Sequence, residues 1–254
     1  MNRNRWIVVA GVVGVVAAAA FFIWFFGRST PDEVSLEDAI SSVSSTSTTT
    51  TVAASGSDDT TTTTTAAAPE GVDGTWTVDP SIGEFSFDDA TSSFAGFRIN
   101  EELSSLGSVT AVGRTPGVSG SFTLEGSTMT AASFEADLTQ IVTDDSRRDN
   151  KAKGALEVST FPTATFTVTS PIDLGVEPAE GTALSIVASG DLNVHGVTRQ
   201  VEFPLEAQLV GDVIVVVGSI NIVFADYDVE LPSAPIVLSV EDNGILEVQL
   251  FFTR

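Results

Sequence analysis

The sequence offers few residues that could perform catalysis. It contains no cysteine and one histidine, His195, which excludes thiolate chemistry, disulfide bonds and zinc sites built from cysteine. His195 and Gly196 stand between two segments of alternating apolar residues. That pattern predicts a two-residue β-turn with a positive φ at both positions. We therefore interpret His195 as a turn residue rather than as a catalytic base or a metal ligand.

The densest group of charges is the stretch DDSRRDNKAKG, residues 144–154. Its acidic residues lack the alternating ligands, central glycine and terminal glutamate of a calcium loop, so helix capping and solvation explain them better. The sequence also has no G-x-S-x-G nucleophile elbow and no glycine-rich phosphate loop that opens a helix. These features predict a protein that is not an enzyme and that holds no metal.

Two interpretations of the basic residues in this stretch remain open. Thr143 or Asp144 can cap a short helix that carries four cations, Arg147, Arg148, Lys151 and Lys153. In one interpretation this helix lies near a ligand, and its cations bind a phosphate or polar head group, with Arg98 or Arg114 assisting. In the other, the cations neutralise neighbouring acidic residues on a solvated helix.

The overall charge narrows the set of partners. The chain has a net charge of −23, and residues 74–254 hold 26 of its 34 acidic residues but eight of its 11 basic ones. Nucleic acid needs a basic surface, so we expect no nucleic-acid partner. A domain with a net charge near −18 also repels anionic ligands at long range.

The N-terminal segment, residues 1–28, reads as a membrane anchor. Residues 6–26 are 21 consecutive uncharged residues, enough to cross a bilayer core of about 30 Å. Arg3 and Arg5 precede the run, which favours a cytoplasmic N-terminus and a C-terminal domain outside the cytoplasmic membrane. A cleavable signal peptide is the alternative, but its apolar region is usually only about 7–15 residues long.

The next segment, residues 29–73, is rich in threonine and serine and contains no aromatic residue. We find no apolar periodicity in it, and this composition predicts a disordered linker. A flexible chain of this length has a mean reach on the order of 35–40 Å.

Residues 74–254 read as one all-β domain. In RQVEFPLEAQLVG, apolar residues from Val201 to Leu209 alternate with polar residues, which is typical of half-buried antiparallel strands. We count about eight to ten such strands, interrupted by the short helix after Thr143. An antiparallel set of this length must protect its edges, and closure into a barrel is one solution. The interior of an eight-stranded barrel is either filled by side chains or holds one small ligand, and both outcomes stay open.

Three sequence blocks suggest a known family. They are GTWTVDPSIGEFSF (residues 74–87), RRDNKAKGALEVSTFPTATFTVTS (147–170) and GDLNVHGVTRQVEFPLEA (190–207). In these blocks the domain resembles the YceI-like family of lipocalin-like β-barrels, which bind polyisoprenoids and related amphiphiles. A fourth block, FRINEELSSLGSVTAVGRTPGVSGSF (97–122), resembles a membrane-anchored actinobacterial branch of that family. The chain departs from the family pattern at Asn150, where a histidine is usual, and after Pro80, which puts the head-group preference in doubt.

The resemblance implies an eight-stranded antiparallel barrel that binds an isoprenoid or fatty amphiphile without catalysis. It needs no cofactor, and the expected ligand is an isoprenoid quinone or polyprenyl lipid. An acidic interaction module with a packed, ligand-free barrel is the alternative, and a homodimer and an enzyme acting on lipid-borne substrates are also left open. The predicted ligand-binding residues are Phe85, Phe87, Phe97, Ile99, Phe122, Leu124, Phe134, Phe161, Phe166, Val168 and Phe203, with Arg147, Arg148 and Lys151 for the head group.

Overall fold

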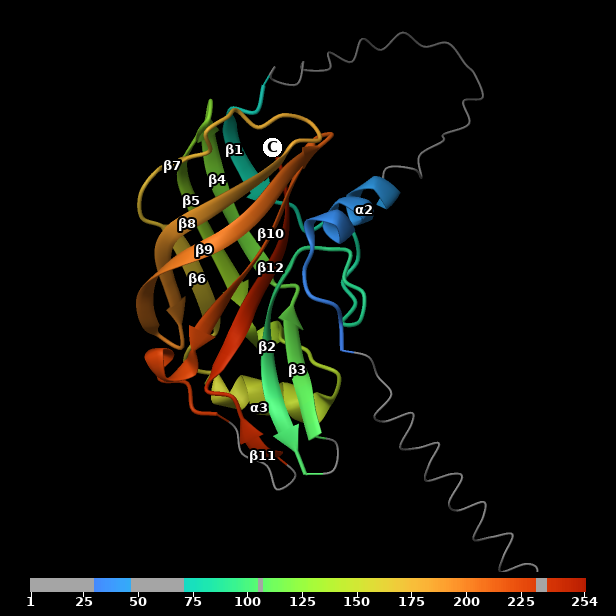
Figure 1. The fold of residues 1–254 in the computed structure, drawn as a ribbon, viewed down its shortest axis with the longest axis vertical. Helices are drawn as coiled ribbons and strands as arrows, with labels where there is room; N and C mark the ends of the chain where they lie inside the picture. The colour runs from blue at the N-terminus through green and yellow to red at the C-terminus, as the bar shows by residue number, and fades with distance from the viewer. Residues whose placement is uncertain (1–29, 47–70, 105–106, 232–236) are drawn as a thin grey trace, which may run out of the picture. The chain divides into compact units, whose positions relative to one another are not determined.

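The computed structural model describes residues 30–46, 71–104, 107–231 and 237–254 (Figure 1). The chain divides into two units at Pro31, and the second unit, Asp32–Arg254, contains the fold described below. The apolar run predicted as a membrane anchor, residues 6–26, lies outside the described residues. Within the described residues, no helix has both the length and the apolar character needed to span a bilayer.

Eight strands pair in a closed antiparallel ring. Strand β1 pairs with both β4 and β12, and this double pairing closes the barrel so that no edge of the ring is left open. The predicted all-β, eight-stranded antiparallel barrel is therefore confirmed. In ring order the strands are β1 (Gly74–Val78), β4 (Val118–Glu125), β5 (Thr128–Asp137), β6 (Thr163–Val168), β8 (Ala183–Val194), β9 (Val197–Val210), β10 (Val213–Val223) and β12 (Asn243–Thr253).

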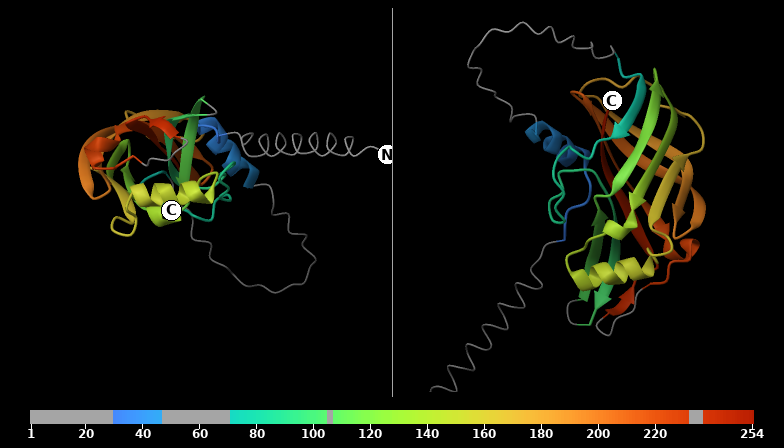
Figure 2. Two further views of the ribbon diagram at one scale, coloured as in Figure 1. Left: turned by 90° about the horizontal axis from the view of Figure 1, so that it is seen from below. Right: turned by 180° about the vertical axis from the view of Figure 1, so that it is seen from behind.

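Four further strands extend the sheet. Strand β2 (Phe94–Leu103) pairs with β12, with β3 (Gly107–Thr115) and with β11 (Val237–Val240), while β7 (Ile172–Asp173) pairs with β5. The described helices after β1 are short: η1 (Leu138–Gln140), α3 (Ser146–Ala155) and η2 (Phe224–Tyr227). Helix α3 is the predicted helical insertion. It lies at the end of the barrel opposite the β4–β5 turn, as Figure 2 shows.

The β8–β9 hairpin turns as the sequence predicts. Val194 pairs with Val197, and the two residues between them have φ values of 53° for His195 and 76° for Gly196. Such a turn matches the twist of the strands it joins. The prediction that His195 is a turn residue with a positive φ is therefore confirmed.

The inward-facing side chains of the barrel form two apolar clusters, one at each end. The cluster at the β4–β5 turn contains Trp76, Phe122 and Phe252, and the cluster at the α3 end contains Leu192, Phe224 and Tyr227. A third cluster lies on the outer face, around Val215, Val217 and Phe251. The interior clusters follow from the period-2 pattern, since alternate residues of a strand face the same side.

The outer cluster corrects the prediction of an entirely disordered linker. Helix α2 (Leu36–Thr46) forms within residues 29–73 and packs against this cluster through Ala39 and Val43, which are 0% and 6% exposed. The apolar residues Leu36, Ala39, Ile40 and Val43 have the i, i+3, i+4, i+7 spacing of an amphipathic helix. Residues 47–70, the remainder of the predicted linker, lie outside the described residues.

Candidate functional site

The barrel contains an apolar cavity of about 120 Å³. By the same measure a single water needs about 10–15 Å³ and two to four polar partners. The cavity is therefore large enough for several water molecules but offers them few polar partners. Among its lining side chains only Thr182 and Gln208 are polar. The cavity is lined by Phe122, Leu124, Met129, Phe134, Phe166, Val168, Leu174, Pro178, Thr182, Leu184, Ile186, Ala188, Phe203, Leu205, Ala207, Gln208, Leu209, Ile214, Val216, Val248, Leu250 and Phe252.

Aromatic pairs stiffen the cavity wall. Phe252 makes edge-to-face contacts with Phe122 and Phe134, with ring centroids 4.8 Å and 5.7 Å apart, and Phe166 makes one with Phe203 at 5.7 Å. Such pairs stabilise a fixed arrangement beyond the burial of their area. These contacts join β4, β5, β6, β9 and β12 across the cavity wall.

The cavity lies toward one end of the barrel. Leu124 and Met129 flank the β4–β5 turn, and Leu174, Pro178 and Thr182 belong to the β7 side and the connection into β8. The opposite end, where α3 lies, is filled by the cluster around Leu192, Phe224 and Tyr227. The residues near the β4–β5 turn therefore lie at the same end of the barrel as the cavity.

The structure brings six of the predicted apolar residues together around the cavity. These residues are Phe122, Leu124, Phe134, Phe166, Val168 and Phe203. Five others do not line it: Phe85, Phe87, Phe97, Ile99 and Phe161. Whether any of these side chains contacts a ligand remains a prediction.

The five residues lie elsewhere for identifiable reasons. Phe85 and Phe87 end the block that resembles the opening strand of the family, but β1 ends at Val78 and both residues lie in the connection to β2. Phe97 packs on the backbone of Gly113 on the neighbouring strand, where an added Cβ would lie 2.4 Å from its ring. Ile99 belongs to the cluster at the α3 end. The ring of Phe161 contacts His195, with centroids 4.7 Å apart.

Sequence reasoning also missed much of the wall. It favoured phenylalanine and passed over aliphatic positions of the same inward faces, such as Leu184, Ile186 and Ala188 on β8. The alternation of the segment ALSIVASG was the signal that could have found them. Most of the aliphatic residues that line the cavity are among the missed positions.

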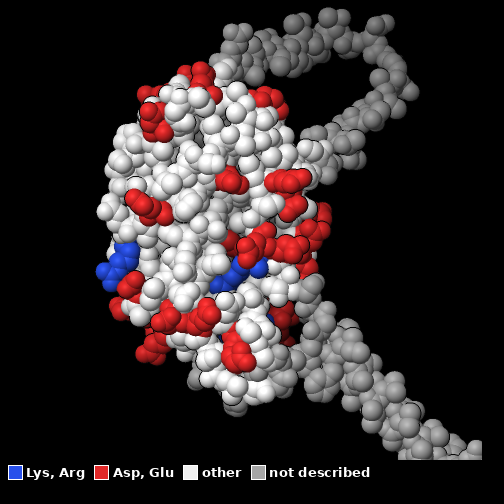
Figure 3. Space-filling model, in the orientation of Figure 1, with Lys and Arg blue, Asp and Glu red and all other residues white. Residues whose placement is uncertain are grey.

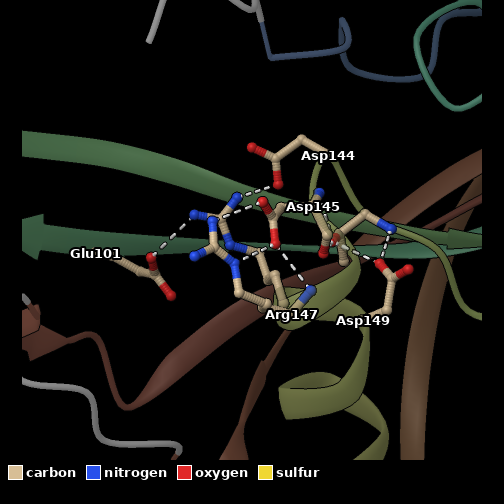
Figure 4. Close-up of polar contacts among 7 residues, drawn as sticks. Glu101, Asp144, Asp145, Arg147 and Asp149 are labelled. Carbon is tan, nitrogen blue, oxygen red and sulfur yellow. Dashed lines mark hydrogen bonds and ion pairs between the residues drawn. The ribbon is translucent and has the colours of Figure 1, made fainter. Parts of the chain in front are cut away.

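The two arginines of α3 pair with acidic neighbours (Figure 4). Arg147 donates to both carboxylate oxygens of Asp145 at 3.0 Å, and Arg148 pairs with Asp144 and, at 3.9 Å, with Glu101. Lys151 is exposed on the same helix. None of the three predicted head-group residues lines the cavity. The contacts of Arg147 and Arg148 are those expected if the cations neutralise neighbouring acidic residues, and head-group binding by α3 stays a prediction.

Local hydrogen bonds set the ionisation of this cluster. Asp145 caps α3 and accepts from the backbone N–H of Arg147 at 2.8 Å. Hydrogen bonds from the Arg147 side chain and backbone lower the pKa of Asp145 to about 2. Burial raises the pKa of Glu101, and the nearby Arg148 guanidinium opposes that change. Asp145 is therefore a carboxylate with a structural role in starting the helix.

The end of the barrel near the cavity is acidic. Exposed Asp173 at the end of β7, and exposed Glu177, Glu180 and Asp212 in the connections, lie next to the lining residues. Glu180 accepts from the backbone N–H of Gly211 at 2.9 Å, so it also fixes the β9–β10 turn. On the face drawn in Figure 3, acidic side chains are widely spread whereas basic ones occupy few places. This surface repels an anionic group.

The sole histidine is held by the fold. His195 Nδ1 lies 3.1 Å from the carbonyl oxygen of Tyr227, and the nearest carboxylate oxygen to Nε2 is that of Glu157 at 3.8 Å. Across the described ranges, no group of three or more histidine, aspartate or glutamate side chains has a geometry that could hold a metal ion. His195 therefore ties the hairpin to η2.

Comparison with known proteins agrees with this geometry. The model of the YceI-like domain matches residues 76–252. A polyisoprenoid-binding domain from Saccharophagus degradans, implicated in plant cell wall breakdown, has a TM-score of 0.56 at 23% identity, over 72% of this chain and 99% of that one. This similarity shows the barrel fold.

Two more distant structures are also similar. Burkholderia cenocepacia BcnA has a TM-score of 0.49 at 18% identity, over 62% of this chain and 95% of that one. The YceI protein of Campylobacter jejuni has a TM-score of 0.46 at 16% identity, over 56% and 84%. Among curated protein sequences, none matches the chain at a significant level.

Proposed function

The chain belongs to the YceI-like family, and from that premise we propose that its barrel binds an isoprenoid or similar amphiphile without catalysing a reaction. The observation that carries the proposal is the apolar cavity of about 120 Å³ inside the barrel. Each buried CH₂ group contributes about 0.8 kcal/mol, so one five-carbon isoprene unit contributes roughly 3–4 kcal/mol before the cost of ordering. A few units are enough for tight binding. The polyisoprenoid-binding domain with the same fold supports this ligand class.

The head group of the ligand is uncharged in this proposal. The lining contains no basic side chain, and the acidic residues Asp173, Glu177, Glu180 and Asp212 lie nearby. Arg254, a cation at this end, stacks on Trp76 at 4.6 Å and donates to the carbonyl of Asp73 at 3.3 Å. An uncharged isoprenoid alcohol or quinone therefore fits this acidic end of the barrel better than an anionic polyprenyl phosphate does.

The proposed location is the outer face of the cytoplasmic membrane. The uncharged run of 21 residues from Trp6 to Phe26, preceded by Arg3 and Arg5, supports an anchor with the N-terminus inside. An apolar ligand then enters or leaves the barrel beside the bilayer that dissolves it.

Lipid extraction tests the binding function. A chain that begins at residue 30 is purified, its organic extract is analysed by mass spectrometry, and uptake of added polyprenol and isoprenoid quinone is measured. In the variant Ala188→Phe, a ring is added to a cavity-lining position that is 0% exposed. The matched control Val187→Phe adds the same ring at the neighbouring position, which is 53% exposed.

We expect a stoichiometric prenyl or acyl compound from the natural chain and the control, and none from Ala188→Phe. A clean extract and no uptake by the natural chain would reject the binding function. The acidic interaction module with a packed barrel would then be the better explanation.

A further inference from the structure

Part of the predicted linker is docked on the barrel, and we call residues 32–46 the strap. Its helix α2 packs on the outer side of β9 and β10 (Figure 1). Ala39 and Val43 are buried against Val215, Val217 and Phe251. These barrel side chains point away from the cavity and would form an exposed apolar patch without the strap.

The strap helix begins with its own cap. The hydroxyl of Ser35 accepts from the backbone N–H of Asp38 at 3.2 Å and donates to the Asp38 carboxylate at 2.7 Å. Glu37 and Asp38 also place negative charge in the first turn, where the helix dipole favours it. The helix is therefore encoded locally and does not depend on residues outside the strap for its start.

A buried ion cluster holds the first residue of the strap. Glu247 is 1% exposed and accepts from Arg98 at 2.7 Å and from Arg114 at 3.1 Å. Both guanidinium groups also donate to the backbone carbonyl of Asp32, Arg114 at 2.7 Å. Donor groups buried this deeply need partners, so releasing Asp32 is costly. The strap is therefore fixed at both its beginning and its helix.

We infer that the strap holds the barrel within a few residues of the membrane, so that the barrel works against the lipid surface instead of ranging on a long tether. This inference rests on the proposed membrane anchor. Only residues 27–31 separate the uncharged run from Asp32, a span of about 17 Å when fully extended. If the strap were released, the whole stretch up to Asp73 would have a mean reach of roughly 35–40 Å.

Energy transfer to a bilayer tests the inference. The full chain, which has no natural cysteine, is labelled at Asp212→Cys or Gln200→Cys and inserted into phosphatidylcholine–phosphatidylglycerol vesicles that contain an acceptor lipid. About forty Gly-Ser residues inserted between Pro31 and Asp32 lengthen the connection to the anchor to a mean reach of roughly 35–40 Å and leave the contacts of the strap in place. The matched control is the same insertion after Thr46, beyond the strap, where a docked strap keeps the connection to the anchor short.

We expect the first insertion to lose energy transfer and the control insertion to keep it, because only the first lies between the anchor and the docked strap. Flotation of the vesicles is measured on the same samples. A chain that does not float overturns the proposed location and the inference with it. Flotation together with equal transfer in the two insertion chains overturns the inference alone, because an undocked strap would make the two insertions equivalent.

Discussion

Arg114 of β3 and Glu247 of β12 form a buried ion pair, with Nε and Oε1 3.1 Å apart, although β2 runs between their strands. Gly96 of β2 lies between them and has no side chain to separate them. A Cβ at this position would lie 3.1 Å from Cγ of Arg114 and 3.4 Å from Cγ of Glu247. The glycine thus lets two strands that are not neighbours share a charge contact.

The first prediction concerns this glycine. Gly96→Ala would place a methyl group 2.7 Å from the carbonyl oxygen of Gly113, so backbone must move. We expect a loss of about 1–3 kcal/mol in the free energy of unfolding, measured by urea denaturation. Gly154→Ala in α3 is the control, because nothing lies within 4 Å of its Cβ. It should gain about 0.5–1 kcal/mol from helix propensity, and equal losses in both variants would contradict the argument.

The second prediction concerns Glu247 itself. Glu247→Gln removes the carboxylate and leaves the buried guanidinium groups of Arg98 and Arg114 without their counter-charge. Breaking a buried pair in this way costs about 3–5 kcal/mol in unfolding free energy. Glu241→Gln, an exposed change of the same kind, should stay within about 0.5 kcal/mol. If Glu247→Gln unfolds at the same urea concentration as the control, the ion cluster does not stabilise the fold.

The outward face of β12, which carries Glu247, shows what strand alternation in the sequence cannot predict. In ILEVQLFFTR, residues 245–254, alternation predicts that Val248, Leu250 and Phe252 face inward, and all three line the cavity. It placed Glu247 and Gln249 outside, and they do point outward, yet they are 1% and 5% exposed. Their burial depends on the strap and the β1–β2 connection, which cover this face. Period-2 patterning describes one sheet and carries no information about a distant segment that covers it.

The covering segments were difficult to foresee for separate reasons. The side chain of Gln249 donates to the carbonyls of Ala90 and Ser92 at 3.1 Å and 3.0 Å, contacts between residues more than 150 positions apart. In the strap, a short apolar stripe is surrounded by serine and acidic residues. The overall composition of residues 29–73 therefore does not indicate that a helix forms there. The barrel could be predicted because its strands repeat one pattern. Each of these covering contacts depends instead on a particular pair of distant residues and follows no repeated pattern.

A third prediction links the cavity to stability. Leu250 lines the cavity and is 6% exposed, so Leu250→Ala should cost about 2–5 kcal/mol in unfolding free energy without ligand. An isoprenoid at 100 times its dissociation constant should add about 2.7 kcal/mol to any variant that still binds it. Val223→Ala, at a position 42% exposed, is the control for loss of methyl groups. If added isoprenoid leaves the thermal unfolding of the natural chain unchanged, binding at the cavity is refuted.

A fourth prediction concerns acid stability at α3. The pKa of Asp145 is about 2 in the folded protein, below its usual value of 3.8, because Arg147 donates to it. Its contribution is therefore complete above pH 4 and disappears as the pH falls toward 2. Asp145→Asn keeps a capping side chain and removes the charge. The urea midpoints of the two chains should differ above pH 4 and converge near pH 2.

The cause of that pH dependence can be isolated. In an Arg147→Gln background, the effect of Asp145→Asn on the urea midpoint above pH 4 should shrink, since the guanidinium has been removed and the backbone N–H of residue 147 still donates. The effect is small in any case, because Arg147 is 76% exposed and solvent screens the pair. A difference that persists unchanged would assign the low pKa to the backbone N–H of residue 147 rather than to the guanidinium.

The last prediction uses the salt dependence of lipid binding to separate the two interpretations of the α3 cations. Repulsion by Asp173, Glu177, Glu180 and Asp212 weakens binding of a polyprenyl phosphate, and salt screens that repulsion. We therefore expect phosphate binding to strengthen between low and physiological salt, while binding of a polyprenol of equal length stays constant. The triple variant Arg147→Gln, Arg148→Gln, Lys151→Gln should bind both lipids as the natural chain does. Titration of each lipid by quenching of Trp76 fluorescence provides the measurement, in a chain that begins at residue 30 and so lacks Trp6 and Trp24. Phosphate binding that weakens with salt and is lost in the triple variant would instead show that α3 binds the head group.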